Sequence, residues 1–174
     1  GSEMCIRDSH YIKQTYRNRC TIAGPDGELA LSIPTVKPDT LKCPMKDIRI
    51  SDHGNWRHLH WNAIESAYNN TPFFEYYKDD FRPFYEKKYE FLIDFNEEIC
   101  RLVCQLIDIQ PNIERTSAYK MEFSAEETDF RENIHPKKDF RTTDPEFSPQ
   151  PYYQVFESKL GFLPNLSIID PLFN

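Results

Sequence analysis

Hydrophobic and polar residues alternate with a period of two in the first part of the chain. The apolar residues Ile22, Leu29, Leu31 and Ile33 lie on either side of the sequence Gly-Pro-Asp-Gly at 24–27. Such alternation is typical of half-buried strands, and a proline between glycines favours a tight turn. The pattern therefore predicts a β-hairpin that turns at residues 24–27.

Apolar residues then recur at intervals of three and four, which is the spacing of one helical face. The first run predicts a helix that begins near Asn55 and ends before Thr71, because the residue that precedes a proline disfavours helical backbone. The aromatic residues of 73–81 are expected to form a short bridge. A second run predicts one long helix over 84–107, with Pro83 in a position that suits a first turn.

Short strands are predicted at 47–51, 114–119 and 152–156, and the charged, proline-containing residues of 120–150 are expected to form a long surface loop. Strands interspersed with helices predict an α/β fold, in which helices pack on a mixed sheet. A length of 174 residues suits a single domain with a sizeable core.

The first nine residues, GSEMCIRDS, show neither hydrophobic periodicity nor a targeting pattern. Their codons can be written as a transposon-type sequencing adaptor, so residues 1–9 are expected to be an artefact outside the fold. The predicted domain then spans 10–174, and its natural sequence begins in the middle of a protein.

Composition excludes several classes of function. The formal net charge of −7 argues against a protein that binds duplex nucleic acid, which usually needs a basic face. No apolar run approaches the roughly 18–20 residues of a membrane span. The cysteines after residue 9 show no zinc-type spacing, so we expect no metal site and a reducing, cytoplasmic environment. Cys100 and Cys104, which are four residues apart on one face of a predicted helix, are expected to be buried thiols.

Three basic residues near the start of the predicted hairpin are a candidate anion site. If residues 13–19 are extended, Lys13, Arg17 and Arg19 share one face of a strand and can point together at a carboxylate or phosphate. The structural alternative is a cationic outer face of a half-exposed sheet.

His60 lies on the apolar face of the first predicted helix, whereas His58 is expected to be exposed. On a helix these two residues are about 200° apart, so they do not form a metal-binding pair. A histidine on an apolar face is either a hydrogen-bonded core residue or, less often, a catalytic base.

Ser167 and Asp170 have the spacing of a helix capping box, which we favour over a nucleophilic serine. The chain contains no nucleophile elbow, no glycine-rich phosphate loop and no dinucleotide fingerprint, so no cofactor is expected.

Taken together, several segments resemble the WbqC-like protein family. They are Tyr11-x-Lys13, Arg17-Asn18-Arg19, Leu31–Pro34, Trp56-x-x-x-His60-Trp61, Tyr68, Thr71–Tyr77, Arg115–Tyr119, Ile134–Lys138 and the ending YYQVFESKLGFLPNLSIIDPLFN. The resemblance implies that the family's first strand–helix unit is missing upstream of His10 and that the C-terminus is also truncated.

The resemblance also implies a role in bacterial surface polysaccharide (O-antigen-type) biosynthesis, as a transferase that moves glycine or another small acyl group to a sugar. His60 would then be the catalytic base. The residues implied to bind an anionic donor or sugar precursor are Lys13, Arg17, Asn18, Arg19, Lys137, Tyr153, Gln154, Asn165 and Asp170. The alternative is a non-catalytic protein that recognises a glycan precursor or a biosynthetic partner.

Overall fold

The computed structural model describes residues 10–39, 43–113, 122, 124, 135–139, 142 and 144–174. The chain divides into two compact units, and each is described by itself. Unit 1 consists of Gly1–Arg17, Thr35–Ser51 and Tyr89–Phe147, and unit 2 consists of Asn18–Pro34, Asp52–Lys88 and Ser148–Asn174. No helix among the described residues is long and apolar enough to cross a membrane.

Unit 2 contains the predicted hairpin, which is confirmed. Strand β1 (Arg19–Gly24) pairs antiparallel with β2 (Gly27–Ser32), and Ile22 lies opposite Leu29. Ile22 is fully buried, whereas Leu29 is exposed. These two strands form the sheet of the described residues, so the prediction of a larger mixed sheet was wrong for that part of the chain.

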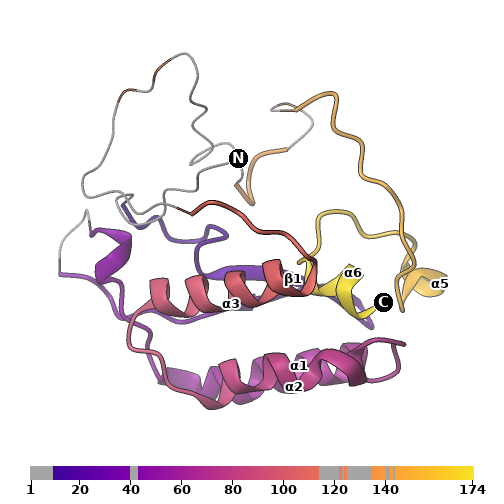
Figure 1. The fold of residues 1–174 in the computed structure, drawn as a ribbon, viewed down its shortest axis with the longest axis horizontal. Coiled ribbons are helices and arrows are strands. Elements are labelled where there is room, and N and C mark those ends of the chain that lie inside the picture. Colours follow the sequence, from indigo (N-terminus) through magenta and orange to yellow (C-terminus); the bar gives the residue numbers. More distant parts are fainter. Residues whose placement is uncertain are drawn as a thin grey trace. The chain divides into compact units, whose positions relative to one another are not determined.

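Two helices of equal length lie side by side in unit 2 (Figure 1). Helix α1 (Trp56–Tyr68) confirms the first predicted helix, but the aromatic bridge predicted at 73–81 is instead most of helix α2 (Phe74–Glu86). The reason is that Phe74, Phe81 and Phe84 lie on one helical face and are buried. Helix α2 continues through Pro83, at the cost of one backbone hydrogen bond.

The single long helix predicted at 84–107 was wrong, because α2 ends at Glu86 and α3 (Leu92–Leu106) begins a new helix. The residues before α3 pair with a distant segment: Ile50 N–H donates to Glu90 C=O, and Leu92 N–H donates to Ile48 C=O. Backbone groups used in this way are not available to a helix. The strand predicted at 47–51 is likewise reduced to isolated bridges beside the short helix η1 (Met45–Asp47).

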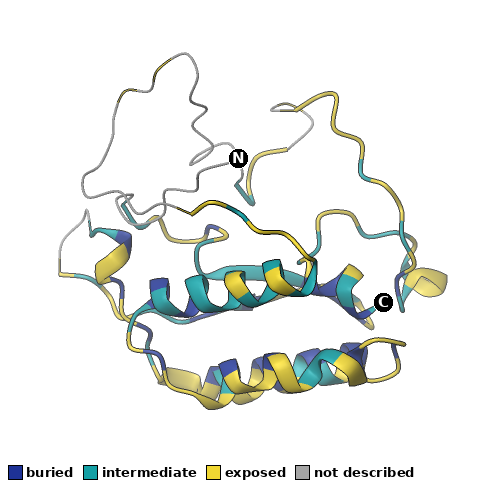
Figure 2. Ribbon diagram, in the orientation of Figure 1, coloured by how far each residue is buried: buried dark blue, intermediate teal, exposed yellow. Residues whose placement is uncertain are grey.

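Unit 1 is built around α3. Its residues Leu92, Ile93 and Phe95 are buried, and α3 contacts η1. Cys100 and Cys104 on the same helix are only half-buried, which corrects the prediction that these two thiols are buried. Figure 2 shows buried positions on α3 mainly in its first turns.

The C-terminal segment of unit 2 forms two short helices, α5 (Glu157–Leu160) and α6 (Ile169–Phe173). Residues 152–156 do not form a strand, so the prediction of a strand there was wrong. Phe173 of α6 is fully buried against the rings of Tyr68, Phe74 and Phe81, so α6 completes the aromatic core between α1 and α2. The strand predicted at 114–119, and most of the loop predicted at 120–150, lie outside the described residues.

Candidate functional site

A cleft of about 370 Å³ lies entirely within unit 2. We call it the basic cleft, and its lining residues are Asp52, Asn55, Arg57, His58, Trp61, Arg82, Tyr85, Glu86 and Lys88. They come from the short helix η2 (His53–Asn55) and the residue before it, from the first turns of α1, and from the end of α2 with the residues that follow. The pairing of α1 with α2 therefore positions the cleft.

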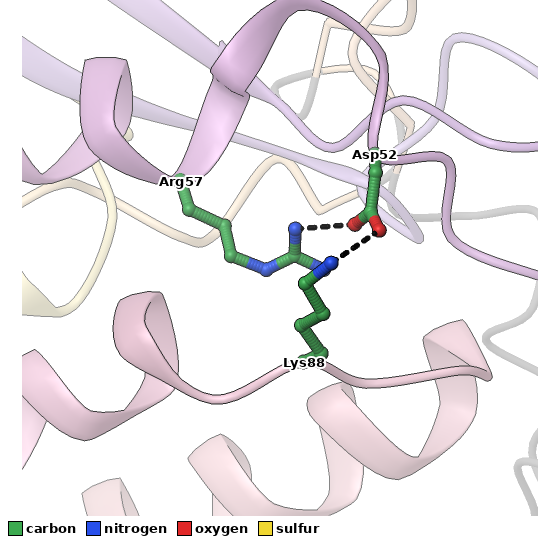
Figure 3. Close-up of polar contacts among 3 residues, drawn as sticks. All are labelled: Asp52, Arg57 and Lys88. Atoms are coloured by element: carbon green, nitrogen blue, oxygen red, sulfur yellow. Dashed lines mark hydrogen bonds and ion pairs between the residues drawn. The ribbon is translucent and has the colours of Figure 1, made fainter.

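Asp52 joins two cations of the cleft (Figure 3). Its Oδ1 accepts a hydrogen bond from Arg57 Nη1 at 2.6 Å, and its Oδ2 accepts one from Lys88 Nζ at 3.1 Å. These hydrogen bonds, with that from Arg57 having the larger effect, lower the pKa of the Asp52 carboxyl group. Asp52 is therefore ionised at neutral pH, and its two oxygens mark where an anion meets both cations.

Arg57 is held more firmly than its two partners. Its side chain is 14% exposed, compared with 56% for Asp52 and 76% for Lys88. The guanidinium carbon lies 4.7 Å from the ring centroid of Trp56, which is a cation–π contact. The Nε atom of Arg57 is buried and has no hydrogen-bond partner among the described residues. The cleft thus contains a guanidinium that its packing on Trp56 holds in place.

Other polar groups of the cleft come from α1 and α2. Arg82 Nε donates to Glu86 Oε1 at 2.7 Å, one turn apart on α2, and this hydrogen bond raises the pKa of Arg82. His58 is exposed, as predicted, and its Nε2 lies 2.9 Å from Asn62 Nδ2. Helix α1 begins here with no side-chain cap and no acid in its first turn.

Two aromatic rings give the basic cleft an apolar side. The rings of Trp61 and Tyr85 lie with their centroids 5.7 Å apart, Trp61 buried and Tyr85 half-buried. Burial raises the pKa of Tyr85, so its hydroxyl keeps its proton at neutral pH. Cations beside aromatic surfaces suit a ligand that has both an anionic group and a ring with apolar faces.

His60, the predicted base, is buried in α1 and does not line the basic cleft. Its ring packs edge-on against Trp56 at 5.2 Å and Tyr85 at 6.3 Å. Burial lowers the pKa of His60 to about 4, against a smaller opposing effect of a backbone hydrogen bond at Ser32. The geometry favours the interpretation of His60 as a core residue, whose ring packs against Trp56 and Tyr85 behind the cleft.

The basic residues before β1 do not share a strand face, so that premise was wrong. Lys13 and Arg17 lie in turns of unit 1, and β1 begins only at Arg19. In unit 2, Arg19 Nε donates to Ser32 Oγ at 3.0 Å, and Asn18 Nδ2 donates to Ile33 C=O at 2.9 Å. Lys137 is exposed in a turn of unit 1.

The predicted residues near the C-terminus have structural partners. Asp170 is fully buried and accepts hydrogen bonds from the hydroxyl groups of Tyr68 at 2.6 Å and Tyr152 at 2.8 Å. The capping-box prediction was therefore wrong, since α6 has no side-chain cap. Gln154 is buried and bonds both backbone polar groups of Leu163 at 2.8 Å.

The other two C-terminal candidates lie at the surface. Tyr153 is 62% exposed, and Asn165 is an exposed residue with a left-handed φ of 62°. None of Tyr153, Gln154, Asn165 and Asp170 lines the basic cleft.

A second, larger cleft of about 650 Å³ lies in unit 1 beside the end of α3. Among its lining residues, Arg101 is accompanied by Glu97 and Asp108, and there is no aromatic ring. This second cleft therefore has fewer unopposed cations and aromatic surfaces for an anionic or sugar-like ligand than the basic cleft has. The described residues contain no group of three or more histidine, cysteine or acidic side chains placed to hold a metal ion.

Sequence reasoning missed Asp52, Arg57 and Lys88. The signal that was available is the pair Trp56-Arg57 at the start of a helix, directly after an aspartate and a glycine-containing turn. Lys88 carried no such signal, because its partner Asp52 is 36 residues away in the chain.

Comparison with known proteins gives one positive result. No curated protein and no solved structure is significantly similar to this chain. The model of the WbqC-like protein family matches residues 4–143, which include α1, α2 and the whole basic cleft, whereas the C-terminal segment lies beyond the match. This confirms the resemblance seen in the sequence: the chain belongs to the WbqC-like protein family.

Proposed function

We propose that this protein is a transferase of bacterial surface polysaccharide (O-antigen-type) biosynthesis, and that the basic cleft binds its anionic sugar substrate or donor. The observation that carries the proposal is the placement of Arg57 and Lys88 beside the rings of Trp61 and Tyr85. Family membership supports the choice of pathway, and the chemistry of the cleft supports the choice of ligand.

The size of the cleft restricts the ligand. Small-molecule sites usually have volumes of about 300–1,000 Å³, and the basic cleft, at about 370 Å³, lies near the lower limit. A sugar phosphate or a small activated acyl group fits this volume better than a complete nucleotide sugar does. The transferred group in the proposal is glycine or another small acyl group.

Within this cleft His58 is the side chain suited to accept a proton from the attacking amine or hydroxyl group of an acceptor, since it is exposed there. His60, with its pKa lowered to about 4, is a weaker base and is buried behind the cleft. Arg57 and Lys88 would hold the donor anion and stabilise charge that develops during transfer. The role of His60 as base stays a prediction. The rates of transfer by the variants His58→Ala and His60→Ala test it, because the variant that lacks the base should lose activity.

The test is thermal unfolding in the presence of sugar phosphates, nucleotide sugars, acyl donors and glycine, since a ligand of the native state raises the midpoint. We expect sugar phosphates to raise it in the wild type and not in Arg57→Ala. Arg49→Ala is the matched control, because Arg49 also pairs with an acid and lies over a ring but belongs to unit 1. A midpoint that no compound in the panel changes would contradict the proposal.

The second candidate is a non-catalytic protein that binds a glycan precursor. The observation that favours it is the composition of the basic cleft, whose lining includes no serine or cysteine that could act as a nucleophile. Saturable binding of a sugar phosphate, without acyl transfer in the presence of any donor of the panel, would favour this candidate over the transferase.

A further inference from the structure

We infer that Asp52 occupies the anion site of the basic cleft as a built-in competitor, and that a phosphate monoester displaces it while a monocarboxylate does not. This inference rests on the proposed function, because it concerns ligand recognition in the same cleft. It assigns the ligand class, a doubly charged phosphoryl group, and it makes Asp52 the residue that determines specificity.

The geometry of Asp52 resembles that of a bound ligand. One carboxylate bridges Arg57 Nη1 and Lys88 Nζ, two donors from separate segments of unit 2 (Figure 3). A phosphoryl group presents three oxygens in a similar arrangement, so it can replace both hydrogen bonds. Its third oxygen is an acceptor that a carboxylate lacks.

Displacing Asp52 costs little. The side chains of Asp52 and Lys88 are 56% and 76% exposed, so water screens their ion pair and takes over their hydrogen bonds when they separate. Exposed ion pairs of this kind contribute little to stability. The carboxylate can therefore turn into solvent, and the charge of Arg57, which is only 14% exposed, is then paired with the incoming phosphoryl group.

Arg57, in contrast, stays in place when Asp52 leaves. Its guanidinium lies over the ring of Trp56, and its side chain is only 14% exposed. A preorganised donor loses little conformational entropy on binding, and a guanidinium binds phosphate through two parallel hydrogen bonds. The site is thus ready for an anion once the competitor is displaced.

The selectivity follows from charge. The cleft contains Arg57, Arg82 and Lys88 against Asp52 and Glu86. An acetate ion brings the same charge as Asp52 but lacks its tether, and the tether gives Asp52 a high effective concentration. A phosphate monoester brings up to two negative charges and a further acceptor oxygen. Only the doubly charged ligand is therefore expected to displace the Asp52 carboxylate from Arg57 and Lys88.

The test is calorimetric titration of the complete chain at constant ionic strength with inorganic phosphate, glucose 1-phosphate and acetate. For Asp52→Asn we expect about a two- to fivefold gain in affinity for both phosphates, because the carboxylate no longer competes for Arg57 and Lys88. Acetate binding should appear in this variant, so the preference for phosphate falls. Arg57→Lys should weaken phosphate binding about tenfold, since it loses the planar fork of the guanidinium.

Asp47→Asn is the matched control, because Asp47 also pairs with a lysine at similar exposure but lies in unit 1, and its affinities should equal those of the wild type. Equal or weaker phosphate binding by Asp52→Asn, with wild-type binding intact, would overturn the inference alone. Absence of binding in the wild type would overturn the proposed function as well. Stronger binding of glucose 1-phosphate than of inorganic phosphate would assign the ligand as a sugar phosphate.

Discussion

Asp170 is a fully buried carboxylate whose described partners are neutral groups. It accepts hydrogen bonds from Tyr68, Tyr152 and the Nδ2 group of Asn174, the last at 3.2 Å. Tyr68 in turn accepts a hydrogen bond from the N–H of Ala23 in β1 at 3.3 Å. Burial, followed by the hydrogen bond to Asp170, raises the pKa of Tyr68, so the hydroxyl remains a donor. This network fastens the C-terminal segment to α1 and the hairpin.

Removing the Tyr68 hydroxyl group tests the network. Tyr68→Phe leaves Asp170 Oδ2 and the Ala23 N–H without this buried partner, so we expect a loss of about 1–3 kcal/mol in the free energy of unfolding, measured in urea. Tyr76→Phe is the control, because Tyr76 is 77% exposed, and it should change stability by less than about 0.5 kcal/mol. Equal stability of the two variants would contradict a structural role for the network.

His60 makes stability depend on pH. Its pKa is about 4 in the folded protein and 6.5 in a model peptide, so between these values the unfolded chain binds a proton that the folded protein does not. Stability therefore falls as the pH falls through this window, by about 1–3 kcal/mol in total after allowance for solvent screening.

The measurement for His60 is urea unfolding from pH 7 to pH 4 for the wild type and His60→Gln. The difference in free energy of unfolding between the two should shrink, or reverse in favour of the variant, as the pH falls. A difference that is constant with pH would show that His60 titrates as it does in an unfolded chain.

At the scale of elements, local signals and long-range pairing compete. The hairpin and α1 were predictable because alternation, turn residues and the Thr71-Pro72 stop are all local. The break between α2 and α3 was not, because it depends on backbone pairing of residues 90–92 with residues 48–50. The capping-box signal at Ser167 and Asp170 was local too, but Tyr68, 102 residues away, binds that carboxylate instead.

Gly27 provides a test of the hairpin. Its φ of +126° is a conformation that side chains rarely adopt, although an added Cβ would meet no atom within 4 Å. We therefore expect Gly27→Ala to lower the free energy of unfolding by about 1–3 kcal/mol through backbone strain alone. Glu28→Ala, at the next and exposed position of β2, should have an effect below about 0.5 kcal/mol in the same urea titration. Similar effects of the two substitutions would contradict this account of the turn.

At the scale of the whole molecule, the family was predictable from the sequence but the candidate site was not. The segments that carry the resemblance recur along the chain in order, and the family match over residues 4–143 confirms the family, while the C-terminal segment lies beyond the match. The basic cleft depends on the side chains of Asp52, Arg57 and Lys88, which meet only after α1 and α2 have packed together. The basic residues singled out beforehand are divided between the two units, with Lys13, Arg17 and Lys137 in unit 1 and Arg19 in unit 2.

We propose that the basic cleft binds a sugar phosphate through Arg57. The most direct measurement is a ¹H–¹⁵N correlation spectrum of the labelled protein titrated with glucose 1-phosphate, with the Arg57 Nε–H signal assigned through its loss in Arg57→Lys. We predict saturable shifts of the Arg57 Nε–H and the Trp61 indole N–H signals, which share one dissociation constant. Saturable shifts that leave both signals unchanged, or no shifts at all, would contradict the account.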